Sequence, residues 1–113
     1  MIYQVLQDQQ GFIWIASAGG LYRYDAGNFI LFQHDPTDSL SLSKNVVKCI
    51  LEDQDGYLWI GTQGGGLNRY DPVLGKFTRF AHSESDIQSL SNNDILCLYQ
   101  DRQGNIWVGT ENG

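Results

Sequence analysis

The chain has 113 residues and a mass of 12.7 kDa. With 42% hydrophobic and 18% charged residues, it is expected to form one small folded domain rather than a disordered chain. Seven Lys and Arg against thirteen Asp and Glu give a net charge of -6 without a basic run, so a nucleic-acid partner is disfavoured. No apolar stretch approaches the roughly 20 residues that cross a bilayer, and the first residues do not resemble a signal peptide. We therefore expect no direct membrane contact by this chain.

Three copies of a ten-residue motif mark an internal repeat. They occupy residues 8–17 (DQQGFIWIAS), 53–62 (DQDGYLWIGT) and 101–110 (DRQGNIWVGT), and their Trp residues are 45 and 48 positions apart. A repeat of this length indicates an array of similar structural units. The positions shared by all copies are Asp8, Asp53 and Asp101; Gly11, Gly56 and Gly104; and Trp14, Trp59 and Trp107.

The second unit predicts four short strands. Segment 46–53 is apolar on both faces, as expected of a strand buried between two layers. A tight turn from Asp53 to Gly56 follows, because Asp accepts backbone N–H bonds and Gly tolerates positive φ. The later strands are more polar and should lie outside. In chain order the predicted strands are 46–53, 57–62, 67–71 and 76–80.

Four antiparallel strands in each repeat of this length are typical of one blade of a β-propeller. We therefore predict an all-β propeller fragment of about two and a half four-stranded blades, near residues 1–33, 46–81 and 94–113. One blade cannot cover its own two apolar faces. The rest of the propeller, or further copies of the chain, is expected to complete the ring.

The run 51–71, with its Asp-x-x-Gly-x-x-Trp-x-Gly-Thr and Gly-Gly-Leu pattern, resembles the two-component regulator propeller repeat. Segments 89–95 and 101–110 resemble it too, whereas the first copy departs from it at Ala16 and Ser17. The resemblance implies the periplasmic sensing half of a bacterial membrane receptor, without catalytic activity of its own. In that family the ligands are often glycan fragments.

Loops at a propeller mouth converge on the axis, so ligand contacts are expected there. The candidate segments are the connection 83–93 and the turns near residues 63 and 111. The candidate ligand-binding residues are Gln63, Asn93 and Glu111.

Two other functions remain open: a propeller hydrolase or lyase that acts on glycans, and a scaffold that binds protein partners. Catalysis would need convergent carboxylates, Tyr or His that break the repeat. No cofactor or metal is expected, because the calcium-like turn at Asp53 and Asp55 has no acidic ligand at the twelfth position.

The remaining recurrent residues favour structural roles. His34 and His82 recur at equivalent positions, as do Cys49 and Cys97. We predict buried free thiols, because the Cα atoms on adjacent inner strands should exceed the roughly 7 Å limit for a disulfide. The Trp residues could stack on sugars, but blade packing is favoured, since a small residue two positions later leaves room for the next blade.

Overall fold

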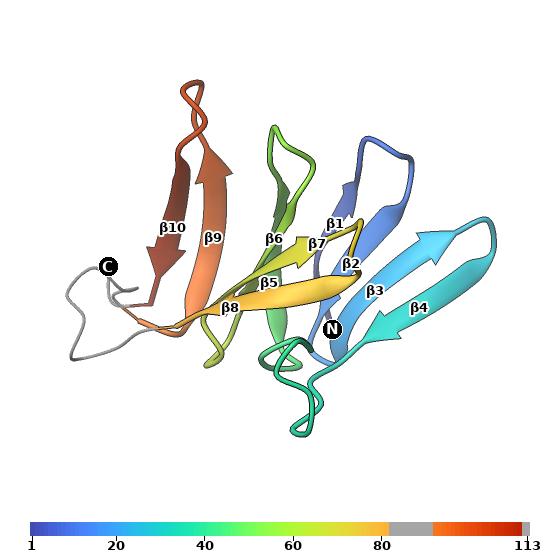
Figure 1. The fold of residues 1–113 in the computed structure, drawn as a ribbon. Coiled ribbons are helices and arrows are strands. Elements are labelled where there is room, and N and C mark those ends of the chain that lie inside the picture. Colours follow the sequence, from blue (N-terminus) through green and yellow to red (C-terminus); the bar gives the residue numbers. More distant parts are fainter. Residues whose placement is uncertain (82–91, 112–113) are drawn as a thin grey trace.

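Residues 1–81 and 92–111 are described by a computed structural model, in which they form ten strands in three antiparallel sheets (Figure 1). The first sheet contains β1 (Ile2–Gln7), β2 (Ile13–Ser17), β3 (Gly20–Asp25) and β4 (Asn28–Phe32). The second contains β5 (Val47–Glu52), β6 (Leu58–Thr62), β7 (Leu67–Asp71) and β8 (Lys76–Phe80). The third contains β9 (Ile95–Gln100) and β10 (Ile106–Thr110). No membrane-spanning helix occurs within these ranges.

Each four-stranded sheet is a meander in which every strand pairs with the next one along the chain. The three sheets lie side by side, and β5 contacts both β1 and β9 (Figure 1). Strands β1, β5 and β9 are therefore the inner strands, while β4 and β8 form largely exposed outer edges. This arrangement confirms the predicted all-β class and the propeller-like stacking of four-stranded sheets.

The hydrophobic core fills the space between the first and second sheets. Trp14 and Leu21 enter it from the first sheet, and Ile60 and Tyr70 from the second. The Trp14 and Tyr70 ring centroids are 5.4 Å apart in an edge-on arrangement, a favourable geometry for aromatic pairs. Neither sheet builds this core alone, so each depends on its neighbour.

The connection between β4 and β5 is fastened to the second sheet. Its Leu42 is fully buried in the core. The buried Asn68 side chain accepts a bond from the Ser43 backbone N–H at 3.1 Å and donates to the Ser43 hydroxyl at 2.7 Å. His34 pairs its Nδ1 with the Leu42 carbonyl at 2.9 Å, which fits its predicted structural role; His82 lies outside the described residues.

Close packing between the second and third sheets requires a glycine. A Cβ on Gly61 would collide with the Cys49 sulfur and with Ile95 on β9. Both cysteines are free, and Cys49 is buried as predicted. The predicted burial of Cys97 is wrong, because no described segment covers the outward face of the third sheet.

Candidate functional site

The turn that recurs in each repeat is built around one carboxylate. Asp8 Oδ1 accepts bonds from the backbone N–H groups of Gln10 (2.9 Å) and Phe12 (3.0 Å). Its Oδ2 accepts a bond from the Trp14 indole N–H at 2.8 Å. This third bond was not predicted from the sequence, although the constant six-residue spacing between Asp and Trp was a visible signal of it.

The other two repeats have the same arrangement. The indole of Trp59 donates to Asp53 at 2.7 Å, and that of Trp107 donates to Asp101 at 2.9 Å. The bond from Trp107, helped by backbone and side-chain bonds from the turn, lowers the pKa of Asp101 below its ordinary value of 3.8. Both oxygens of each Asp carboxylate are thus used to hold the turn and orient the Trp ring.

Two of the three predicted ligand-binding residues line one cavity of about 270 Å3. Gln63 reaches it from the turn after β6, and Glu111 from the end of β10. The third, Asn93, lies beside it: its backbone carbonyl accepts bonds from Gly64 N–H at 3.2 Å and Gly66 N–H at 2.9 Å. The structure thus brings Gln63 and Glu111 together, while most of the predicted connection 83–93 lies outside the described residues.

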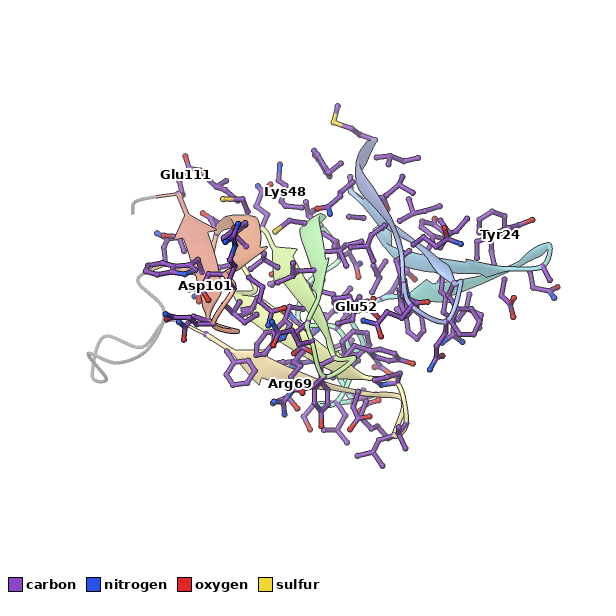
Figure 2. The ribbon with its side chains drawn as sticks, turned by 90° about the horizontal axis from the view of Figure 1, so that it is seen from above. Tyr24, Lys48, Glu52, Arg69, Asp101 and Glu111 are labelled. Atoms are coloured by element: carbon purple, nitrogen blue, oxygen red, sulfur yellow. The ribbon has the colours of Figure 1, made fainter. Side chains whose placement is uncertain are left out.

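The cavity also contains charged residues that were not predicted from the sequence. Lys48 lines it from β5, and Asp94 lines it from the position just before β9. The Lys48 ammonium lies 4.1 Å from the Tyr3 ring centroid, a cation–π distance. Figure 2 shows Lys48 and Glu111 toward the same end of the molecule. Lys48 could have been selected, because the equivalent positions of the other units are Tyr3 and Leu96.

This set of residues offers both hydrogen-bond donors and acceptors. Lys48 and the Gln63 amide can donate, and the Asp94 and Glu111 carboxylates can accept. Such a mixture suits a polar ligand that carries several hydroxyl or amide groups. No cluster of three metal-ligating side chains occurs in residues 1–81 and 92–111.

Comparison with known proteins identifies relatives of this fold. The profile of the family described as two component regulator propeller matches residues 41–64 and 89–112. A search of curated proteins gives no significant match.

Solved structures match nearly the whole chain. One is the extracellular domain of BT3049, described as a hybrid two component system of B. thetaiotaomicron; it is 30% identical, with a TM-score of 0.87 over 95% of this chain and 15% of that one. Two structures of the extracellular domain of BT4673 from the same organism, described as a one component or hybrid two component system, are 24% and 25% identical. Their TM-scores are 0.59 and 0.58 over 97% of this chain and 20% of theirs.

The chain thus spans less than a quarter of the length of these relatives, and it superimposes on a fragment of a propeller domain. The family match covers both the second and the third Asp–Trp motifs in full. Residues 41–64 and 89–112 of this chain thus match the two component regulator propeller family, and the chain has the fold of a propeller fragment.

Proposed function

We propose that this chain is part of a non-catalytic, extracytoplasmic sensor propeller of a bacterial two-component-type receptor, placed in the periplasm. The observation that carries the proposal is the TM-score of 0.87, at 30% identity, with the extracellular domain of BT3049. The chain would supply ligand-binding surface, and a signalling output would reside elsewhere in the receptor.

The ligand in this proposal is a small molecule or glycan held at the cavity between Gln63 and Glu111. Lys48, Asp94 and Glu111 support it, because charged groups of both signs meet there beside the exposed amide of Gln63. Hydroxyl groups both donate and accept hydrogen bonds, so a sugar can satisfy such a set without carrying a net charge. Asn93 contributes by holding the glycine turn that carries Gln63 in place.

The partners in this proposal are the remaining blades of the propeller or further copies of the chain. We assign the first blade to residues of about 1–33, the second to about 46–81, and a half blade from about 94 onward. The free apolar faces of the first and third sheets support this requirement, because isolated sheets do not leave both faces in water.

A ligand screen on the intact protein tests the proposal. Thermal-shift measurements against a panel of oligosaccharides are expected to identify a ligand that raises the melting temperature. Glu111→Gln and Gln63→Ala should weaken its binding roughly tenfold or more, as expected for hydrogen bonds to a charged group or amide. The control is Gln54→Ala, which removes an exposed amide from the turn after β5.

Three results would contradict the proposal. Equal effects of Gln63→Ala and Gln54→Ala would remove the cavity as the binding site. Turnover of an oligosaccharide would favour the hydrolase or lyase instead. Saturable binding of a protein partner, with no small ligand found, would favour the scaffold.

A further inference from the structure

A second cavity, of about 410 Å3, lies at the other end of the strands from the site described above. It is formed between the turn after β1, the turn after β5 and the turn after β7. Both sheets that form it have all four strands, so its shape does not depend on a further blade. Its lining includes the aromatic residues Phe12, Trp14 and Tyr70.

Arg23 on β3 lines this cavity and lies over aromatic rings. Its guanidinium carbon lies 4.9 Å from the Phe12 ring centroid and 5.5 Å from that of Trp14. The Arg23 Nε is buried and has no hydrogen-bond partner among the described residues. A guanidinium that lies over aromatic rings and has no carboxylate partner among the described residues is positioned to receive an anion.

The opposite wall departs from the repeat. The second unit has Glu52 and Asp55, whereas the equivalent positions of the first and third units are all glutamine. These glutamines are Gln7 and Gln10 in the first unit, and Gln100 and Gln103 in the third. Departures from an otherwise regular repeat are where function is expected.

The two acidic residues are used differently. Glu52 accepts a bond from the Gln9 backbone N–H, at 3.1 and 3.3 Å to its two oxygens, and so links the two sheets. The Asp55 carboxylate accepts no hydrogen bond from any described residue, although its backbone N–H is bound to Asp53. Arg23 and Asp55 are therefore the cation and the carboxylate of this cavity whose charged groups form no hydrogen bond with any described residue, whereas the carboxylates of Asp8 and Glu52 accept bonds from neutral N–H groups.

We propose that this cavity binds a small zwitterion, an amino acid or short peptide, with its carboxylate on Arg23 and its ammonium on Asp55. A purely anionic ligand would be repelled by Glu52 and Asp55, and a purely cationic ligand by Arg23. A neutral polyol would leave the Arg23 charge uncompensated. The aromatic lining favours an apolar or aromatic side chain on the ligand.

Calorimetric titration of the protein with L-phenylalanine tests the proposal against three matched probes. N-acetyl-phenylalanine lacks the ammonium, phenylethylamine lacks the carboxylate, and methyl β-glucoside carries neither charge. L-phenylalanine should bind saturably and shift the Trp14 indole resonance. Each probe that lacks one charge should bind roughly tenfold more weakly or worse, as expected for the loss of one charge-assisted bond.

Variants place the binding at this cavity. Arg23→Gln should abolish the preference for a free carboxylate, and Asp55→Gln the preference for a free ammonium. Asp55→Gln is a mild change, because glutamine occupies that position in the other two units. Arg69→Gln is the control. Arg69 is the equivalent of Arg23 in the second unit, and its guanidinium carbon lies 4.7 Å from the Tyr57 ring centroid, but it does not line this cavity.

The proposal is overturned if no saturation occurs below about 10 mM, a concentration that corresponds to negligible affinity. It is also overturned if phenylethylamine binds as tightly as L-phenylalanine, if methyl β-glucoside is preferred, or if Arg69→Gln weakens binding as much as Arg23→Gln.

Discussion

In each repeat, one Asp carboxylate both closes a turn and orients the Trp ring of the same repeat. The carboxylate closes its own turn through backbone bonds and fixes the adjacent indole ring through a third bond. The ring then faces the following sheet. Trp14, covered by the second sheet, is 2% exposed, whereas Trp107, with no described sheet beyond it, is 63% exposed.

The bond from Trp107 makes the ionisation of Asp101 a direct test of this pairing. Because the bond lowers the pKa of Asp101, its carboxylate should titrate below 3.8, and Trp107→Phe should raise its pKa toward 3.8. The stability from these bonds is present above the unfolded pKa and is lost as the pH falls through the lowered folded pKa. Carboxyl carbon NMR titration measures the pKa of Asp101 in the unchanged chain and in Trp107→Phe. An unchanged pKa in the variant would contradict the assignment.

The two thiols should differ sharply in reactivity. Burial raises the pKa of Cys49 to about 12, so its thiolate is scarce at neutral pH, and Cys97 is exposed. A disulfide reagent should therefore modify Cys97 rapidly and Cys49 only after unfolding. Mass spectrometry identifies the modified residue, and Cys97→Ser serves as the control. Rapid labelling of Cys49 in the folded chain would contradict this expectation.

At the scale of the element, the β3–β4 hairpin contains a correctable strain. Its two central residues, Ala26 and Gly27, have φ of 49° and 92°, and Ala adopts this conformation at a cost. Ala26→Asn should stabilise the chain by about 0.5–1 kcal/mol, because Asn is preferred at this position of the turn. Urea unfolding measures the gain. Ala18→Asn, exposed and without a positive φ, should give none.

The packing between the second and third sheets is sensitive to substitution of Gly61. Gly61→Ala forces a methyl group against Cys49 and Ile95, so we expect a loss of about 1–3 kcal/mol from overpacking. The matched control is Gly19→Ala, where an added Cβ would meet nothing within 4 Å. Equal unfolding midpoints for the two variants would show that the sheets separate to accept the methyl group.

The strands were predictable because their signals are local. Turn residues such as Asp53 and Gly56 and the spacing of the Trp residues define the hairpins without knowledge of the fold. The hydrogen bonds between Ser43 and Asn68 could not be predicted from local signals, because they join positions 25 residues apart. At the candidate site, loop geometry predicted Gln63 and Glu111, whereas Lys48 required knowing which inner-strand side chains face the cavity.

At the scale of the whole molecule, two apolar flanks remain open. Phe29, on the outer face of the first sheet, is 62% exposed, whereas its counterpart Phe77 in the second sheet is 4% exposed. Tyr99 and Trp107 are exposed on the third sheet. The difference between Phe29 and Phe77 arises because a neighbouring sheet covers only the second of them.

Because of these flanks, the isolated 113-residue chain should associate as its concentration rises. Val5→Lys, on the open flank of β1, should weaken the association by placing a charge where another sheet would pack. Val73→Lys, in the exposed turn after β7, is the control. Sedimentation velocity measures the association of the unchanged chain and of the two variants. An unchanged chain that stays monomeric at all concentrations would contradict the expectation.

Because each Trp indole is bonded to the Asp of its own turn, the orientation of the ring does not depend on a neighbouring blade. The Trp face on which an added blade would pack is already ordered by its own sheet, and the same Asp–Trp bond recurs in each of the three sheets. Duplication or deletion of one whole unit therefore leaves the Asp–Trp bonds within the other units unchanged.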